Sequence, residues 1–359
     1  MGEIFEYERP DNYIVISEKY SDAYPIPVLT ANQAFVLGYT SETSGIYDKG
    51  PVILFDDFTC YMKYADFPFK VKSSAMKLLT SKKEIPIFYA YNLLQHINYK
   101  PEGHARHWIS IMQPLKVLLP CYAEQERIGE FLSLVCKKIE KHQLLIDALK
   151  KYKRGVVKTL LDPNQNKRHD VVWETDTIGN LGTFIKGAAL SKADISNTGT
   201  PFILYGELYT TYKEVVRSIV RTTQASVDDV YLSRVGDVVV PTSGETPEEI
   251  STASCIMVPD VILAGDLNIY RSTIVDGRIM SYLLNHIVNE QIARVAQGKS
   301  VVHVQASEIG KILITYPDHK EQERIAQILE LLDNRIVASE NTLNSMQKMK
   351  KALLQQLFI

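Results

Sequence analysis

Apolar residues recur at alternating steps of four and three residues along two long segments of the chain. In the first segment the series is Ile128, Leu132, Val135, Ile139, Ile146, Leu149, Val156 and Leu160. In the second segment it is Ile325, Leu329, Leu332, Ile336, Leu343, Met346, Leu353 and Leu357. This heptad spacing is typical of a coiled-coil seam and predicts two helices of roughly 35 to 40 residues each.

The two series belong to an internal duplication. Polar residues interrupt both at matching places, because Lys153 and Lys350 lie 197 residues apart (350 − 153), as do His142 and Ser339 (339 − 142). The sequence Glu-Gln-Glu-Arg-Ile occurs at 124–128 and again at 321–325, each time four residues after a proline. A repeat of this length is too long for a solenoid or a propeller. Each copy is therefore expected to be a whole domain followed by its own helix.

Helices of this length need a partner, because isolated helices are marginally stable in water. Since the globular segments lie between the helices in the sequence, we expect the two helices to pair in antiparallel orientation, with one globular domain at either end. The alternative is that each helix packs back on its own domain as part of its core. His96 and His286 lie inside apolar helical segments and are expected to be structural residues.

The short apolar run at 52–55 and the segment 237–240, which is apolar after its first residue Asp237, predict buried strands, and each leads into a polar segment. The polar segments differ, Asp-Asp-Phe-Thr after the first run and Pro-Thr-Ser-Gly-Glu-Thr after the second. A common strand framework with different loops favours two mixed α/β domains of one architecture that recognise different targets. Neutral drift of surface loops is the alternative. The expected divisions are 1–113 and 166–311 for the domains, and 114–165 and 312–359 for the helical regions.

Composition narrows the class of protein. With 359 residues, 45% of them hydrophobic, the chain can bury two ordinary cores, and no apolar run is long enough for a membrane span. The four cysteines form no Cys-x-x-Cys pair, which argues against a zinc site and for reduced thiols in the cytoplasm. A net charge of −2 argues mildly against nucleic acid, but binding depends on local patches.

Such a patch is expected between residues 60 and 83, where six lysines accompany a single acid and several aromatic residues. The loops around 103–108, 206–213, 241–246 and 297–303 combine hydroxyl, basic and aromatic side chains. Solvated surface lysines are the alternative explanation. The candidate DNA-binding residues are Thr59, Lys63, Tyr64, Lys70, Lys72, Ser73, Ser74, His104, Arg106, Tyr209, Thr210, Tyr212, Lys213, Thr242, Ser243, Glu245, Lys299, Ser300 and His303.

Several motifs together resemble one family, the specificity (S) subunit of type I restriction-modification systems, also called the HsdS family. The matching residues are Trp173 with Leu181-Gly182, the stretch Gly206–Thr210, Gly2 with Phe5-Glu6-Tyr7, the stretch 67–74 and both Pro-x-x-x-Glu-Gln-x-Arg-Ile helix starts. The resemblance covers almost the whole chain. One departure is that the first domain begins directly at Met1-Gly2. Either its natural start lies upstream or this domain lacks an edge.

The resemblance implies two target-recognition domains, each reading one half of a split, asymmetric double-stranded DNA target, with the antiparallel coiled coil setting the gap. It also implies two methyltransferase (M) subunits as partners, and restriction (R) subunits through them. S-adenosylmethionine, ATP and Mg²⁺ are then used by the partners and no cofactor is bound by this chain. Candidate methyltransferase contacts are Gln125, Arg127, Lys137, Lys138, Lys141, Gln322 and Arg324. Helix capping and solvation are the alternative roles of these residues.

Catalysis by the chain itself is not indicated. A solitary adenine methyltransferase needs an Asn/Asp-Pro-Pro-aromatic loop, and the nearest string, 162–164, lacks the second proline and the ring. No Gly-x-x-x-x-Gly-Lys-Ser/Thr or Gly-x-Ser-x-Gly motif occurs. Two alternatives to a DNA-specificity subunit remain, a coiled-coil scaffold that binds only proteins and a self-sufficient enzyme. Sequence-selective DNA binding would distinguish a specificity subunit from the scaffold. A self-sufficient enzyme would have to transfer methyl groups as the isolated chain.

Overall fold

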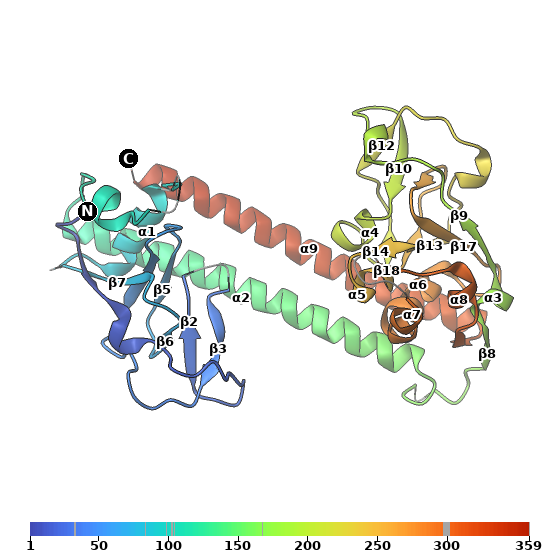
Figure 1. Ribbon diagram of the computed structural model, residues 1–359, viewed down its shortest axis with the longest axis horizontal. Helices are drawn as coiled ribbons and strands as arrows, with labels where there is room; N and C mark the ends of the chain where they lie inside the picture. Colours follow the sequence, from blue (N-terminus) through green and yellow to red (C-terminus); the bar gives the residue numbers. More distant parts are fainter. Residues whose placement is uncertain are drawn as a thin grey trace. The chain divides into compact units, whose positions relative to one another are not determined.

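The computed structural model describes residues 1–31, 34–82, 84–97, 99–101, 103, 105–166, 168–296 and 302–358. The chain divides into two compact units. The first unit comprises Met1–Leu144 and Glu340–Ile359, and the second comprises Leu145–Ser339. Each unit contains a mixed α+β globular part and a section of each of two long helices (Figure 1).

The first unit is built on two sheets. An antiparallel sheet has the order β1-β7-β4-β5, with β1 Phe5–Glu8, β4 Val52–Asp56, β5 Met62–Ala65 and β7 Met76–Ser81. A smaller sheet has the order β3-β2-β6, with β2 Ile26–Leu29, β3 Val36–Thr40 and β6 Lys70–Val71. Strand β4 is buried along its whole length, as its apolar sequence predicts. Helix α1 (Ile87–Ile97) packs against β5 and β7 (Figure 1).

The second unit repeats this topology and adds one strand to its main sheet, β11, which pairs parallel with β15. Its main sheet has the order β11-β15-β13-β17-β9, with β9 Thr183–Lys186, β11 Val215–Val216, β13 Asp237–Pro241, β15 Ser254–Ile256 and β17 Leu267–Arg271. Its smaller sheet has the order β12-β10-β16, with β10 Thr200–Leu204, β12 Arg221–Thr223 and β16 Ile262–Ala264. In both smaller sheets the central strand pairs antiparallel on one side and parallel on the other. The prediction of two domains of the same architecture is therefore confirmed.

Short elements complete the units. In the first they are η1 Pro10–Tyr13 and a π-helical turn, η2 Trp108–Met112. In the second they are α3 Ile178–Leu181, η3 Lys192–Asp194, α4 Glu207–Thr210, η4 Asp229–Tyr231, β14 Ser243–Gly244, α5 Pro247–Ile250, α6 Gly277–His286, α7 Asn289–Val295, β18 Val302–His303 and α8 Ala306–Gly310. Helix α6 follows β17 as α1 follows β7.

The two units also differ at one edge. In the second, β8 (Trp173–Thr177) pairs antiparallel with β19 (Leu313–Pro317), and the Ile178 amide donates to the Ile312 carbonyl at 3.0 Å. In the first, the amino group of Met1 donates to the carbonyl of Leu115, the residue 197 positions before Ile312. The segment 116–120, which matches β19 in the repeat, pairs with no strand in the described residues. Among the described residues, the first unit therefore has no strand in the place that β8 takes in the second.

The two long helices are α2 (Tyr122–Leu161, 40 residues) and α9 (His319–Leu357, 39 residues). In the first unit the last residues of α9 join a core cluster with Ile128 and Leu132, from the beginning of α2. In the second unit the last residues of α2, Val157 and Leu161, join a cluster with the beginning of α9. The helices therefore pair antiparallel, as predicted. The helices also contribute to the core of each globular part, so the packing that was considered as the alternative to helix pairing occurs together with it.

Both lysines that interrupt the heptad series contact a globular part. In the second unit Lys153 is buried, and its Nζ lies 3.0 Å from Glu214 Oε2 and 2.5 Å from Asp333 Oδ1. In the first unit Lys350 Nζ donates to Gln95 Oε1 on α1 at 3.1 Å. A buried ammonium without such partners would be costly. These interruptions therefore attach the helices to the globular parts.

Candidate nucleic-acid interface

In the first unit, the polar segment that follows β4 is largely occupied by internal bonds. Asp56 Oδ1 accepts from the amides of Phe58 and Thr59 at 2.9 and 2.8 Å. Asp57 Oδ1 accepts from the Trp108 amide at 2.8 Å, and its Oδ2 pairs with Lys77 at 3.1 Å. The two carboxylates therefore shape the loop, which leaves the side chain of Thr59 exposed.

The lysines predicted to form a basic patch instead contact other residues of the same unit. Lys70 is buried, and its Nζ pairs with Glu42 and donates to the Ser44 carbonyl, both at 2.7 Å. Lys72 pairs with the exposed Glu18 at 2.5 Å. Lys63 is half-buried, 6.0 Å from the centre of the Phe35 ring. Because a buried ammonium is not available to a phosphate, Lys70 is left out of the interface that we propose below.

Other candidates of the first unit lie on its surface. Ser73 and Ser74 are exposed, and the guanidinium of Arg106 lies 5.9 Å from the Phe58 ring on an exposed loop. Tyr64 instead packs edge-on against Phe88 at 5.0 Å, and burial raises its pKa. His104 lies outside the described residues.

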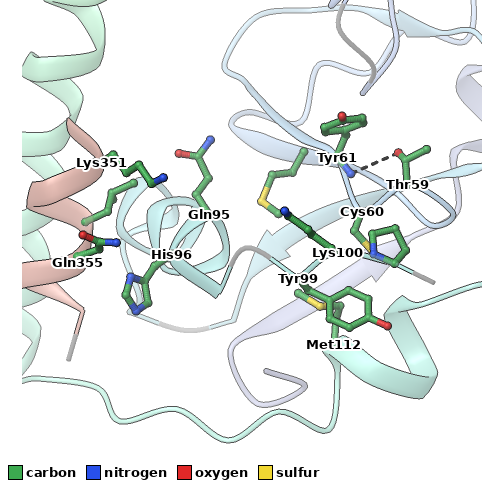
Figure 2. Close-up of a pocket in the computed structure, with 13 residues that line it drawn as sticks. Thr59, Cys60, Tyr61, Gln95, His96, Tyr99, Lys100, Met112, Lys351 and Gln355 are labelled. Atoms are coloured by element: carbon green, nitrogen blue, oxygen red, sulfur yellow. Dashed lines mark hydrogen bonds between the residues drawn. The ribbon is translucent and has the colours of Figure 1, made fainter. Parts of the chain in front are cut away.

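A cavity of about 650 Å³ in the first unit brings Thr59 together with other polar side chains (Figure 2). Tyr61 and Lys100 line the same cavity, and Lys351 and Gln355 of α9 reach it from the helix. Hydroxyl, phenol and ammonium groups are the groups that proteins direct to phosphate oxygens and base edges. Tyr61 and Lys100 were not among the predicted site residues, although both lie close in sequence to residues that were.

In the second unit, α4 and the residues after it carry much of the candidate site. Glu207 is buried, whereas Thr210 is exposed and donates its hydroxyl to the Gly206 carbonyl at 2.8 Å. Tyr209 is half-buried, and burial raises the pKa of its phenol. The hydroxyl oxygen of Tyr212 accepts from the Val220 amide at 3.0 Å. Lys213 is exposed.

The fold brings some of these residues together with residues of a later loop. One cavity of about 800 Å³ is lined by Tyr209, Thr210 and Glu245, although Tyr209 and Glu245 lie 36 positions apart in the sequence (245 − 209). Ser243 is buried and donates to Asp266 Oδ2 at 2.8 Å, so its hydroxyl has an internal partner. Thr242 is half-buried and His303 is exposed. Lys299 and Ser300 lie outside the described residues.

A second cavity of about 330 Å³ adjoins this region and is lined by Tyr209, Tyr212 and Lys213. Glu214 and His286 also line this cavity, and His286 Nε2 donates to Glu214 Oε1 at 2.7 Å. Burial alone would raise the pKa of Glu214, but the bond from His286 and the charge of Lys153 lower it to about 2. His286 therefore has the structural role that its sequence position predicts.

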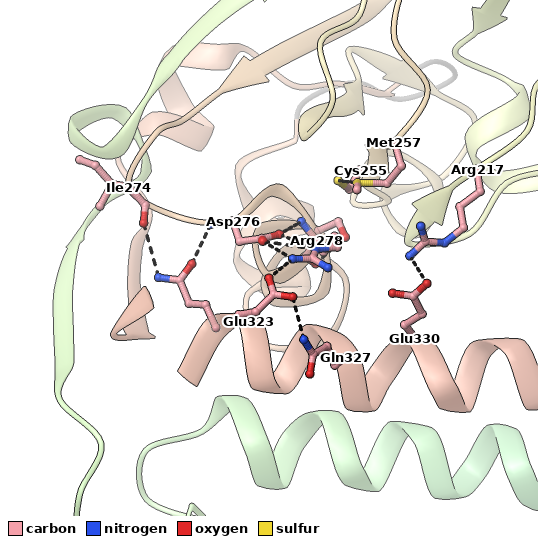
Figure 3. A network of polar contacts seen from close by, with 11 residues as sticks. Arg217, Cys255, Met257, Ile274, Asp276, Arg278, Glu323, Gln327 and Glu330 are labelled. Carbon is pink, nitrogen blue, oxygen red and sulfur yellow. Dashed lines mark hydrogen bonds and ion pairs between the residues drawn. The ribbon is translucent and has the colours of Figure 1, made fainter. Parts of the chain in front are cut away.

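The repeated helix starts are organised by glutamine side chains. Gln322 is buried, accepts from the Asp276 amide at 2.7 Å and donates to the Pro317 carbonyl at 2.9 Å. Gln125, its repeat equivalent, donates to the Pro120 carbonyl at 2.8 Å. Next to Gln322, Arg278 pairs with Asp276 at 2.6 Å and with Glu323 at 2.5 Å (Figure 3). These bonds fit the structural role that was left open for both glutamines, and partner binding by them stays a prediction.

The other candidate partner residues are more accessible. Arg127, Lys137, Lys138 and Lys141 are exposed on α2. Arg324 is half-buried and pairs with Glu321 of the same helix turn. Large apolar residues are exposed among the cations of α2, with Phe131 at 46% and Leu134 at 67%. Sequence analysis missed these two, although their spacing from Arg127, by four and then three residues, is visible in the sequence.

Arg221 was also missed. It begins β12, and its Nε donates to Glu207 Oε1 at 2.8 Å inside the larger cavity. No motif in the sequence connects the two residues, because the contact depends on how the smaller sheet is placed beside α4. Among the described residues, no group of three His, Cys, Asp or Glu side chains is arranged to hold a metal ion. None of the helices within the described ranges is long and apolar enough to cross a bilayer.

Comparisons with known proteins agree with this architecture. The family model of the type I restriction modification DNA specificity domain matches residues 1–151 and 171–346. The type I restriction enzyme EcoR124I/EcoR124II specificity subunit of Escherichia coli is 30% identical over 354 residues, which cover 93% of this chain and 85% of that protein.

Two solved structures show the same fold. The S subunit of a type I restriction-modification system from M. genitalium superposes with a TM-score of 0.67 at 15% identity, covering 100% of this chain and 94% of that one. A chain from a structure concerned with complex assembly and conformational transition of the type I R-M system gives a TM-score of 0.56 at 11% identity, covering 99% and 97%. The chain therefore belongs to the family of type I restriction-modification DNA specificity subunits.

Proposed function

We propose that this chain selects the DNA target of a type I restriction-modification complex, with each unit reading one half of a bipartite sequence. The observation that carries this proposal is a strand framework that is repeated in both units and bears different loops. One scaffold with two sets of donors and acceptors is what two unrelated half-sites require. The match of the family model to both halves of the chain supports the same conclusion.

The residues around the cavities support DNA as the ligand. Thr59, Tyr61 and Lys100 in the first unit, and Tyr209 and Lys213 in the second, combine hydroxyl groups with cations. Phosphate contacts of this kind position a protein on the duplex, and loops that reach the grooves read about three to five base pairs each. A protein-binding scaffold requires none of these polar cavities.

The paired helices are proposed to set the gap between the half-sites. A helix of 40 residues extends for about 60 Å at 1.5 Å per residue. Lys153 and Lys350 attach the helices to the globular parts through buried or half-buried bonds. A spacer that is joined to its recognition domains in this way transmits its own length to the DNA sequence that is selected.

We propose that two copies of a methyltransferase subunit bind the helix starts. Arg127, Phe131, Leu134 and Lys138 follow one another at steps of four and three, so they form one stripe on α2. The equivalent positions 197 residues later are Arg324, Ile328, Leu331 and Arg335 on α9, and Leu331 is 70% exposed. The same mixture of apolar and basic residues thus occurs twice, which fits two copies of one partner with an apolar and acidic surface.

The chain itself is proposed to be non-catalytic and to act in the cytoplasm, where it meets DNA. S-adenosylmethionine would be bound by the methyltransferase subunits, and ATP and Mg²⁺ by a restriction subunit that joins through them. The chain's own contribution is to place the target adenines within reach of its partners.

The test is to co-express the chain with its methyltransferase subunit and to map methylated adenines across the host genome by long-read sequencing. We expect a split, asymmetric motif that is absent when the methyltransferase subunit is expressed alone. A soluble complex that adds no methylation would instead favour the scaffold. Methylation by the isolated chain would contradict the non-catalytic role.

A further inference from the structure

The larger cavity of the second unit, of about 800 Å³, gathers polar side chains from segments that are far apart in the sequence. Residues of η3, of α4, of β12 and of the loop after β14 contribute to it. They include Lys192, Tyr205, Glu207, Tyr209, Arg221 and Glu245. Arg221 and Glu207 lie 14 positions apart and meet only in the folded unit.

Glu207 holds the guanidinium of Arg221 in a fixed orientation. Glu207 is 7% exposed, and its Oε2 accepts from the Leu204 amide at 3.2 Å, while its Oε1 accepts from Arg221 Nε at 2.8 Å. The Arg221 side chain is 48% exposed. Within the described part of the chain its two Nη groups have no hydrogen-bond partner. The pair therefore leaves both Nη groups free, in a preset direction, for a ligand.

The surroundings of Arg221 favour a base edge over a phosphate. Glu207, Glu245 and Asp266 bring three carboxylates to the same cavity, against the two cations Lys192 and Arg221, and this excess of negative charge disfavours a phosphate. Guanine instead presents two neutral acceptors, O6 and N7, at the spacing of two guanidinium N–H groups. The rings of Tyr205 and Tyr209, 6.5 Å apart, offer flat apolar surfaces beside them.

We propose that Arg221, positioned by Glu207, reads one guanine in the half-site that the second unit recognises. Arg221 would be the specificity-determining residue and Glu207 its positioning residue. This inference rests on the proposed function, because it assigns one base of the target to one side chain. It does not depend on which bases the first unit reads.

The test is the methylome of the full complex carrying Arg221→Ala, Arg221→Lys or Glu207→Gln. Wild type should show guanine at a position where Arg221→Ala accepts other bases, with a preference of roughly 5- to 150-fold lost there. Arg221→Lys retains the charge but not the planar fork, so it should relax the same position even if the alanine variant fails to fold. Glu207→Gln should weaken the preference at that position by a smaller factor.

Arg217→Ala is the matched control. Arg217 is 43% exposed and pairs with Glu330 at 2.9 Å, but it does not line the cavity (Figure 3). Its variant should keep the wild-type motif. If both Arg221 variants methylate the wild-type motif at a uniformly lower frequency, Arg221 contacts phosphate and the inference is overturned. If the wild-type complex adds no bipartite motif at all, the proposed function itself has failed.

Discussion

At the scale of single residues, the buried network of the second unit connects both long helices to the recognition region. Glu214 receives bonds from His286 and Lys153, and Asp333 of α9 shares the same lysine and also accepts from the Tyr282 hydroxyl. Glu214 directly follows Lys213, a candidate DNA contact. A change at Glu214 therefore acts on the attachment of the helices and on the recognition loop together.

We expect Glu214→Gln to destabilise the second unit by roughly 3 kcal/mol at pH 7. The pKa of Glu214, near 4.5 when unperturbed, is lowered to about 2 in the fold. Its contribution to stability is therefore complete above about pH 4.5 and is lost as the pH falls towards 2. Thermal unfolding of the full chain at pH 7 measures the destabilisation, and a second measurement at pH 3 measures its pH dependence. From pH 7 to pH 3 the variant should lose less stability than wild type.

The matched control for this prediction is Glu330→Gln, which removes a half-exposed carboxylate paired with Arg217. Exposed pairs of this kind contribute about 0 to 1 kcal/mol. Equal unfolding temperatures for Glu214→Gln and wild type at pH 7 would show that the network does not stabilise the unit.

At the scale of elements, the exposed stripe on α2 gives a prediction about stoichiometry. Phe131→Asp with Leu134→Asp should remove one of the two methyltransferase subunits that we propose bind the chain, because buried carboxylates oppose an apolar contact. Leu331→Asp should weaken binding of the other. Light scattering of the purified complex should then show one methyltransferase subunit per chain for the double variant.

Met349→Asp serves as the control, since Met349 is 53% exposed on α9 and lies outside both stripes. It should leave two subunits bound. A complex that keeps both copies in the Phe131/Leu134 double variant would place the docking surface elsewhere.

Helices and strands could be predicted from the sequence where the spacing of apolar residues alone determines the type of element. The heptad series predicted both long helices and the places where polar residues interrupt them. The segments 52–55 and 237–240 predicted the buried strands β4 and β13. Lys70 could not be identified as buried, because its partner Glu42 lies 28 positions away across the smaller sheet. The contact between Arg221 and Glu207 was missed for the same reason, since such contacts depend on how strands are placed rather than on spacing.

At the scale of the whole molecule, the proposed spacer makes a length-dependent prediction. Inserting one heptad into both α2 and α9, after residues 144 and 339, adds about 10 Å of helix, which corresponds to about three base pairs. We expect the gap in the methylated motif to grow by that amount while both half-sites stay unchanged. An insertion in α2 alone shifts its pairing with α9 and should abolish modification. Altered half-sites with an unchanged gap would refute the spacer.

The segment 116–120, which pairs with no strand among the described residues, has a consequence for the behaviour of the chain at high concentration. Unpaired backbone groups on a strand edge are a template for any extended chain, including another copy. Leu118, at the centre of this segment, is 87% exposed, and a cavity of about 680 Å³ borders the segment. We expect concentration-dependent self-association, which Leu118→Lys should reduce in sedimentation experiments. Solubility would then be limited by one short backbone segment rather than by the surface as a whole.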